Sequence, residues 1–329
     1  MPFREIRTSF VTGGTGFVGS HLVDHLLQRG SEVRCLVRDR SRLRWLQGKP
    51  VTLVEGDLDS EAIIRDAASG TDAFFHLAGA TAAASREQYF RVNAEGSRKA
   101  ARAALEAAEP PGVFIYVSSM AAVGPGLSGE VVAETRRPLP VTDYGRSKLD
   151  GERILSGMGP LPLVTLRPPT VYGPRDREVL PMFRLASKGF LPLLNPEASL
   201  SLVHVEDLVR GIVAAAQHSR IGETYFITHP EPIATVDLPG YFSDALGRRV
   251  RGLRVPGGVL AAAASVSEGW GRLTGRMPVF NRQKVRELTA ASWVCSYEKA
   301  REQIDFTAGI AIADGVARTA RWYEEQGWL

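Results

Sequence analysis

The fold is decided by one stretch near the N-terminus, Phe10-Val11-Thr12-Gly13-Gly14-Thr15-Gly16-Phe17-Val18-Gly19. A short apolar run leads into three glycines spaced three residues apart, and apolar residues at helical spacing follow in residues 21–27. This order predicts a strand, a tight turn and a helix. Such glycines let the backbone approach a pyrophosphate, toward which the helix N-terminus presents N–H groups. The glycine pattern alone also fits an ordinary strand–helix turn, so the rest of the chain has to decide.

Length and composition place the chain among globular proteins. Its 329 residues suffice for one large domain or two ordinary ones, and 44% are apolar while 23% are charged. A net charge of +4, spread over scattered cations, does not indicate a nucleic-acid partner. The two cysteines, Cys35 and Cys295, lie in apolar stretches. We expect buried thiols and a reducing cytoplasm.

No targeting or membrane-spanning segment is expected. Arg4, Glu5 and Arg7 interrupt what would be the apolar core of a signal peptide. No apolar run approaches the roughly 20 residues that span a bilayer. The best candidate, residues 255–266, contains Pro256 and two glycines. We interpret it as a helix that covers a substrate.

Strand and helix patterns alternate through the first half. Strands are expected at residues 9–12, 32–37, 51–55, 73–77, 113–118 and 163–167, and helices at 16–29, 61–68, 89–108 and 144–156. This alternation predicts βαβ units and a doubly wound parallel sheet, an α/β fold whose ligands bind beyond the C-terminal strand ends.

The pattern changes after residue 167, where prolines become frequent. Two more strands are expected at residues 200–205 and 224–227, with a helix at 205–217 between them, and the chain beyond is expected to be mostly helical. We therefore predict a dinucleotide-binding domain of residues 1–172 plus 200–228. A smaller substrate-binding region would consist of residues 173–199 plus 229–329.

Tyr144 and Lys148 carry the chemistry. Four residues apart, they lie one above the other on a helix face. A neighbouring cation is expected to lower the pKa of a phenol, which can then exchange a proton with a hydroxyl carbon's oxygen while hydride moves. Ser119 follows a buried strand, and its hydroxyl can donate a hydrogen bond to the oxygen that gains charge. Each feature has an ordinary explanation: an exposed helix for the pair, a turn-forming serine for Ser119.

Together these residues resemble the extended short-chain dehydrogenases/reductases of the NAD-dependent epimerase/dehydratase superfamily. The resemblance covers nearly the whole chain and implies a Rossmann fold with a smaller, mostly helical C-terminal region. The motifs that carry it are the glycine triplet, Asp57, His76-Leu77-Ala78-Gly79-Ala80, Asn93, the serine pair Ser118-Ser119, Tyr144 with Lys148, Arg167-Pro168-Pro169-Thr170-Val171-Tyr172-Gly173-Pro174, Val203-His204-Val205-Glu206-Asp207-Leu208 and Arg321-Trp322-Tyr323-Glu324-Glu325-Gln326-Gly327-Trp328.

By position, the resemblance implies a role for each site residue. Ser119, Tyr144 and Lys148 would form the catalytic triad, and Lys148 would also hold the nicotinamide ribose. The amides of Phe17 and Val18 would meet the pyrophosphate, and no metal is expected. The other cofactor contacts would be Gly13, Gly16 and Gly19 at the turn, Asp57 and Leu58 at adenine, Leu77, Ala78, Gly79, Ala80 and Asn93 along the ribose and phosphates, Ser118, and Pro168, Pro169 and Val171 at the nicotinamide amide.

The end of the second strand favours NADP over NAD. NAD-preferring relatives place an acidic residue at the position of Val37, where it binds the ribose hydroxyls. Here Val37 is apolar and Arg38 follows, a side chain that can pair with a 2′-phosphate, with Arg42 as a second cation. The alternative is that these arginines form a solvated face and that Asp39 turns inward to bind NAD.

The substrate is expected to be a moderately apolar alcohol or ketone. Sugar-nucleotide enzymes of the family commonly have asparagine where this chain has Thr170, and dehydratases carry an Asp–Glu pair soon after the active-site serine or threonine. Here Ser119 is followed by Met120-Ala121-Ala122-Val123-Gly124. This form and the pair Pro168-Pro169 look more like the 3β-hydroxysteroid dehydrogenase and dihydroflavonol reductase branches. Residues 255–266, Trp270, Met277 and Phe280 would suit such a substrate, or serve as core packing.

Three readings therefore remain open. The first is an NAD(P)-dependent oxidoreductase that acts on a secondary alcohol or ketone. The second is a nucleotide-sugar epimerase or dehydratase, for which Arg175 could meet a phosphate or simply be solvated. The third is a non-catalytic cofactor-sensing protein. A homodimer through the helices at residues 89–108 and 144–156 is usual in the resembled family.

Overall fold

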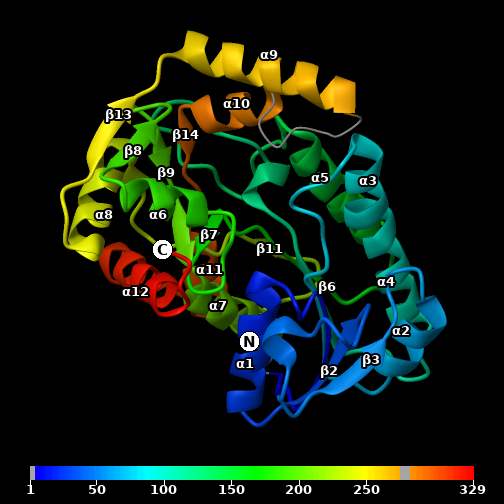
Figure 1. Cartoon of the computed structure of the whole chain (residues 1–329). Helices are drawn as coiled ribbons and strands as arrows, with labels where there is room; N and C mark the ends of the chain where they lie inside the picture. Colours follow the sequence, from blue (N-terminus) through cyan, green and yellow to red (C-terminus); the bar gives the residue numbers. More distant parts are fainter. Residues whose placement is uncertain (1–3, 275–281) are drawn as a thin grey trace.

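A seven-stranded parallel sheet runs through the lower half of the molecule as drawn in Figure 1. The computed structural model describes residues 4–274 and 282–329. The strand order is β11-β6-β5-β4-β1-β2-β3, and every pairing in this sheet is parallel. The strands are β1 (Thr8–Thr12), β2 (Glu32–Val37), β3 (Thr52–Glu55), β4 (Ala73–His76), β5 (Val113–Val117), β6 (Leu163–Leu166) and β11 (Thr224–Tyr225). The predicted Rossmann-like α/β fold is confirmed.

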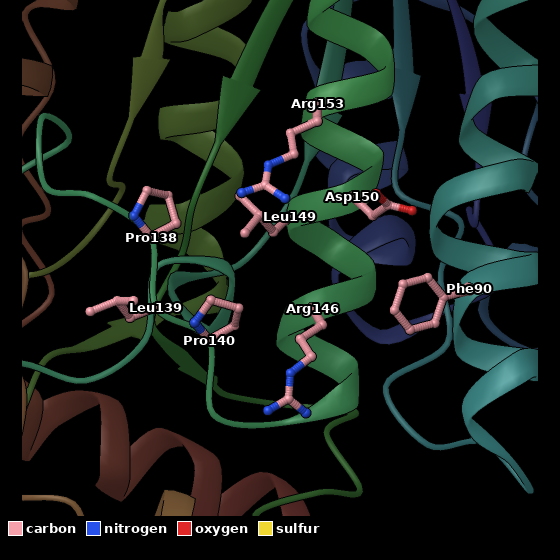
Figure 2. A pocket seen from close by; sticks show the side chains of 8 residues that line it. All are labelled: Phe90, Pro138, Leu139, Pro140, Arg146, Leu149, Asp150 and Arg153. Atoms are coloured by element: carbon pink, nitrogen blue, oxygen red, sulfur yellow. The ribbon is translucent and has the colours of Figure 1, made fainter.

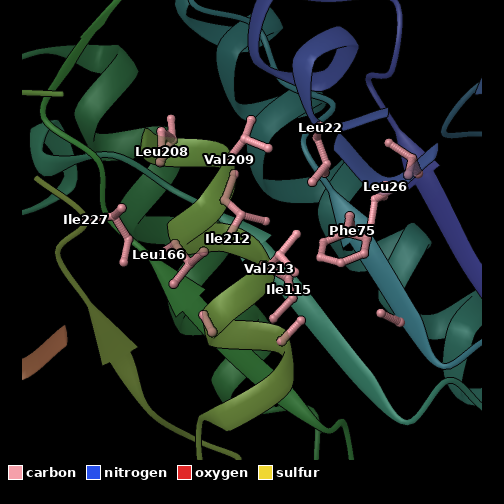
Figure 3. Close-up of a cluster of buried hydrophobic side chains, with 14 of the residues drawn as sticks. Leu22, Leu26, Phe75, Ile115, Leu166, Leu208, Val209, Ile212, Val213 and Ile227 are labelled. Carbon is pink, nitrogen blue, oxygen red and sulfur yellow. The ribbon is translucent and has the colours of Figure 1, made fainter. Parts of the chain in front are cut away.

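Helices cover both faces of this sheet, because the strands bury side chains on both sides. One apolar core joins the sheet to α1 (Phe17–Gln28), α7 (Val205–His218) and α11 (Glu298–Ile304). Figure 3 shows α7 placing Val209 and Ile212 against the sheet residues Ile115 and Leu166. The second core joins the sheet to α2 (Glu61–Ala68), α4 (Gly96–Leu105) and α5 (Asp143–Ser156).

A second group of elements has its own apolar core. It contains α6 (Leu180–Ala186), α8 (Leu238–Leu246) and α12 (Ile312–Glu325), and α9 (Gly257–Thr274) and α10 (Arg282–Thr289) lie beyond it. Small sheets belong to this part: β7 (Thr170–Tyr172) with β10 (Leu202–His204), β8 (Phe190–Leu193) with β13 (Arg251–Arg254), and β9 (Ser199–Leu200) between β12 (Ile233–Ala234) and β14 (Ser292–Trp293).

Residues 89–108 do not form the single regular helix that was predicted. The chain forms α3 (Arg86–Phe90), a π-helical segment η2 (Arg91–Glu95) and then α4. The π turn leaves the Asn93 carbonyl to accept hydrogen bonds from the hydroxyls of Ser97 (2.8 Å) and Tyr116 (3.3 Å). Tertiary partners of this kind are invisible to helical periodicity, and π segments often mark functional regions.

Two strand predictions beyond residue 167 also need correction. The stretch 200–205 is split at Ser201, whose N–H donates to Trp293 O (2.8 Å), so β9 and β10 belong to different sheets. The strand at 224–227 ends at Tyr225, because the Phe226 N–H donates to Glu134 Oε1 (2.9 Å). The C-terminal region is mostly helical, as predicted, with the short strands β12, β13 and β14 in addition. Both cysteines are buried and free, as predicted.

Candidate active site

The glycine turn lies between β1 and α1, against the end of β4. Gly13 has a φ of +78°, and a Cβ there would lie 2.7 Å from Ala78 N, so only glycine fits both the backbone and the space. Gly16 is the N-cap of α1 and has no side chain to cap the first-turn amides. The amides of Phe17 and Val18 are therefore left for another acceptor at this end of the helix. The geometry fits a dinucleotide pyrophosphate.

The segment that follows β4 links this turn to Lys148. Residues Leu77 and Ala78 meet Gly13, and a Cβ at Gly79 would lie 3.2 Å from Lys148 Nζ. Ala80 is held to Asn93 by two hydrogen bonds, from Ala80 N to Asn93 Oδ1 (2.7 Å) and from Asn93 Nδ2 to Ala80 O (3.0 Å). Residues 77–80 thus form a continuous segment, called the floor below, that runs from the glycine turn to α5.

Asn93 acts in this structure as a support for that floor. Its side chain is fully buried, and its amide also donates to Ser147 Oγ on α5 (2.9 Å). The amide group therefore ties the β4 loop to α5. A contact of Asn93 with the cofactor ribose remains a prediction.

Ser119 and Tyr144 are brought together by the packing of α5 on the end of β5. Ser119 caps the short helix η3 (Met120–Ala122), and its hydroxyl accepts from Ala121 N (3.1 Å). Gly145 packs so tightly on Ala121 that a Cβ would collide with its carbonyl group. This packing puts the first turn of α5 beside η3, and the Ser119 side chain acts to lower the pKa of the Tyr144 phenol.

Lys148 is buried one turn further along α5. Its ammonium donates to Val117 O at the end of β5 (2.9 Å) and lies 5.1 Å from the centre of the Tyr116 ring. Burial lowers the pKa of Lys148 to about 8, an effect that the carboxylate of Glu152 opposes. The lysine is therefore a charged group at neutral pH that holds its proton only weakly.

The pKa of Tyr144 is raised, whereas the sequence predicted that it would be lowered. Burial raises the pKa of the phenol above its ordinary value, and the hydrogen bond with Ser119 only partly opposes this. The predicted lowering by Lys148 is not found in this structure, where burial sets the direction of the shift and the ammonium donates to the Val117 carbonyl. The phenol is protonated at neutral pH.

A buried polar network behind Lys148 was not predicted. Glu152 receives two hydrogen bonds from Arg167 (2.9 and 2.6 Å) and one from the Ser118 hydroxyl (2.5 Å), and all three residues are buried. Ser118 thus gives its only hydroxyl proton to Glu152, and its expected cofactor contact stays a prediction. The signal was present in the sequence, since Glu152 lies four residues after Lys148 and therefore on the same helix face.

The remaining predicted residues follow β3 on one side of this centre and β6 on the other. Pro168 O accepts from Met120 N (2.8 Å), which fixes the turn after Ser119. Asp57 is exposed, and its carboxylate accepts from Asp59 N and Ser60 Oγ (both 3.0 Å) before α2. Leu58, Pro169 and Val171 are partly exposed. Their contacts with a cofactor remain predictions.

Of Arg38, Arg40 and Arg42, which follow β2, two form ion pairs, and Arg38 forms none with the described residues. Arg40 pairs with Glu55 (3.2 Å), and Arg42 pairs with Asp39 (3.4 Å), whose carboxylate also accepts from Ser41 N (2.8 Å). Arg38 is exposed, and within the described part of the chain it has no ion pair or side-chain hydrogen bond. Asp39 thus faces its own turn, whereas Arg38 is available to a ligand.

Arg175 is neither solvated nor available to a substrate phosphate. Its guanidinium pairs with Asp24 (2.8 Å), donates to Ser20 Oγ (3.1 Å) and lies 5.1 Å from the Trp45 ring. It fastens the loop after β7 to α1.

A hollow of about 390 Å³ lies on the opposite side of α5 from the site. Figure 2 shows Arg146, Leu149, Asp150 and Arg153 of α5 facing it, with Phe90 across from them. None of Ser119, Tyr144 and Lys148 lines it, so it belongs to the outer surface of the helices expected to dimerise. Among residues 4–274 and 282–329, no cluster of three or more His, Cys, Asp or Glu side chains could hold a metal.

Comparisons with known proteins agree with this geometry. Residues 9–228 match the NAD dependent epimerase/dehydratase family. The chain belongs to this family. Ceramide reductase of Caulobacter vibrioides is 33% identical over 97% of this chain and 95% of its own length. A 3 beta-hydroxysteroid dehydrogenase/Delta 5-->4-isomerase of Mycobacterium tuberculosis is 30% identical over 82% of this chain and 76% of its own length.

A solved structure gives the same result for the fold. The crystal structure of dTDP-glucose 4,6-dehydratase from Streptomyces venezuelae, with NAD bound, superposes with a TM-score of 0.78 at 25% identity and covers 98% of both chains. The protein is therefore an NAD(P)-dependent enzyme of the extended short-chain dehydrogenase/reductase type, as its motifs predicted.

Proposed function

We propose that this enzyme interconverts a secondary alcohol and a ketone on a moderately apolar, steroid- or flavonoid-like substrate, with NADP as the preferred cofactor. One observation carries the proposal. The Ser119 hydroxyl, the Tyr144 phenol and the buried Lys148 ammonium lie at the C-terminal ends of the strands, as the glycine turn does. Residues 77–80 connect the turn to Lys148.

Each of the three side chains has a defined task in ketone reduction. The protonated Tyr144 gives its proton to the carbonyl oxygen as negative charge develops there. Ser119 donates a second hydrogen bond to the same oxygen. Lys148 holds the nicotinamide ribose and keeps positive charge near the phenol. The nicotinamide, when bound, supplies or accepts the hydride.

Residues of the sheet edge would hold the cofactor. The amides of Phe17 and Val18 would bind the pyrophosphate, and Arg38 would pair with the 2′-phosphate that distinguishes NADP from NAD. Val37, buried where NAD-specific relatives place a carboxylate, supports the same preference. The other contacts are Gly13, Gly16, Gly19, Asp57, Leu58, Leu77, Ala78, Gly79, Ala80, Asn93, Ser118, Pro168, Pro169 and Val171.

The substrate region would consist of residues 173–199 plus 229–329, facing a dinucleotide domain of residues 1–172 plus 200–228. Two named relatives, a ceramide reductase and a steroid dehydrogenase, support an apolar substrate. A nucleotide-sugar substrate is disfavoured, since Arg175 is occupied by Asp24 and no acid follows Ser119 closely. We further propose a cytoplasmic homodimer through α4 and α5, across the surface that holds the hollow of Figure 2.

The decisive experiment is Tyr144→Phe, which removes the proton donor and keeps the ring. With NADPH and a panel of apolar ketones, the rate is expected to fall by about 10²- to 10⁴-fold, while NADPH binding, followed by its fluorescence, changes little. Tyr297→Phe, away from the site, is the matched control and should keep full activity. A Tyr144→Phe enzyme with most of its rate would refute the proposed role.

The cofactor preference is tested at Arg38. Arg38→Ala is expected to weaken NADPH binding about ten- to hundredfold, because a charge-assisted pair with the 2′-phosphate is lost, and to leave NADH binding nearly unchanged. Arg40→Ala is the matched control, since Arg40 already pairs with Glu55. Equal losses for the two cofactors would show that Arg38 is an ordinary surface cation.

A further inference from the structure

Helix α9 presents apolar residues on the side that the protein leaves uncovered. Leu260 and Ala264 are buried beneath the helix, whereas Val259 and Val266 are 57% and 74% exposed. Ala262 and Ala263 are exposed as well, which completes an apolar stripe at helical spacing from residue 259 to 266. Helices that are apolar all round are normally buried on every side. Figure 1 shows α9 as the outermost element, with α10 beneath it.

The strand that leads into α9 is strongly basic. Arg248, Arg249, Arg251 and Arg254 are all exposed, and Leu253 between them is 49% exposed. Residues 245–267 contain four arginines and no acidic residue. In the described chain none of these arginines has a carboxylate within ion-pair distance, and Arg248 donates to the Ser187 carbonyl (2.6 Å).

A further cation joins them from the neighbouring strand. Strand β13 pairs with β8, so that Arg251 N donates to Gly189 O (2.9 Å) and the exposed Lys188 lies beside the arginines. We call these five cations and the stripe of α9 the basic–apolar edge. Its members are Lys188, Arg248, Arg249, Arg251, Arg254, Val259, Ala262, Ala263 and Val266.

We propose that the basic–apolar edge docks the enzyme on the surface of an anionic lipid membrane. Apolar side chains of α9 enter the boundary between headgroups and acyl chains, and the four arginines of residues 248–254 meet lipid phosphates. The unpaired positive charge selects this occupant, because an apolar protein partner would not require four arginines without carboxylate neighbours. The helix would lie in the plane of the membrane.

This arrangement differs from a membrane span. In the described residues, no helix is both long and apolar enough to cross a bilayer. Docking of this kind is reversible and depends on ionic strength, because the electrostatic part is screened by salt. The inference depends on the surface alone and holds whichever substrate the active site takes.

The test is co-sedimentation of the full chain with vesicles of two compositions. We expect binding to vesicles of equal parts phosphatidylcholine and phosphatidylglycerol, weak binding to phosphatidylcholine alone, and release at high salt. Arg249→Glu with Arg251→Glu should weaken binding at least about fivefold per arginine. Val259→Glu with Val266→Glu should abolish it, and both double variants should unfold at the wild-type temperature, since all four side chains are exposed.

Matched controls are Arg29→Glu with Arg220→Glu for charge, and Ile221→Glu for an exposed apolar side chain outside this edge. These controls should bind vesicles nearly as wild type does. Wild-type protein that stays in the supernatant with anionic vesicles would overturn the proposal. It would also be overturned if the valine variants changed the molecular mass in solution without affecting vesicle binding, because a second copy of the chain would then cover α9.

Discussion

Helices α5 and α10 approach the same site and are built in opposite ways. In α5, eight residues are buried, among them Lys148 and Glu152, and these two side chains are hydrogen-bonded to neighbouring residues. In α10 no residue is buried. Its contacts include Gln283 with Asp143, and its carbonyls accept from Asn195 at Thr289 (3.0 Å) and from Trp293 Nε1 at Glu287 (2.8 Å). Proton transfer needs side chains fixed in position, whereas a substrate wall can be loosely attached. We therefore propose that α5 carries the chemistry and that α10 belongs to the region that selects the substrate.

The largest effect should come from the buried pair under α5. Glu152→Leu leaves the Arg167 guanidinium buried without its partner, which is expected to cost about 3–5 kcal/mol in the free energy of unfolding. Urea denaturation measures this loss. On α10, Glu287→Leu removes a partly exposed partner of Lys284 and should cost less than about 1 kcal/mol. Similar costs for the two variants would remove the contrast between the helices.

The pH dependence of cofactor binding tests the same pair of residues, Lys148 and Glu152, without disrupting the fold. The pKa of Lys148 lies at about 8, so its positive charge is present below that pH and is lost above it. If the charged lysine holds the ribose, NADPH affinity falls as the pH rises through about 8. The Glu152 carboxylate raises this pKa, so Glu152→Gln should move the midpoint to lower pH. Fluorescence titrations of NADPH across this pH range measure the midpoint. An unchanged midpoint in the Glu152→Gln variant would show that Glu152 does not affect the pKa of Lys148.

Local sequence patterns were sufficient for the sheet and the glycine turn. Strand β2 and helix α2 were predicted to the residue, because alternation, turn glycines and helical periodicity are all local signals. The positions of Ser119, Tyr144 and Lys148 followed from one strand end and one helix face.

Features that depend on tertiary partners could not be predicted in this way. The π turn at Asn93 depends on hydroxyls from α4 and β5, and the break at Ser201 depends on a carbonyl from β14. The pKa of Tyr144 moved opposite to expectation because a sequence shows the neighbouring cation and hides the burial. Glu152 was missed for a related reason. The spacing places it on the same helix face as Lys148, but its pairing with Arg167 depends on a residue that is distant in the sequence.

The smallest effect should arise where the two helices meet. Gln283 of α10 accepts from Asp143 N and donates to Asp143 Oδ2 (both 2.7 Å), one residue before Tyr144. Gln283→Ala removes both bonds and should raise the KM for the substrate roughly five- to tenfold, with little change in kcat or in the unfolding temperature. Gln283→Glu, which faces the Asp143 carboxylate with a like charge, should raise the KM further. Gln303→Ala, on α11, is the control. If Gln283→Ala lowers kcat and leaves KM unchanged, α10 belongs with α5 to the catalytic machinery. The proposed division between a rigid helix for chemistry and a loosely attached helix for substrate selection would then be wrong.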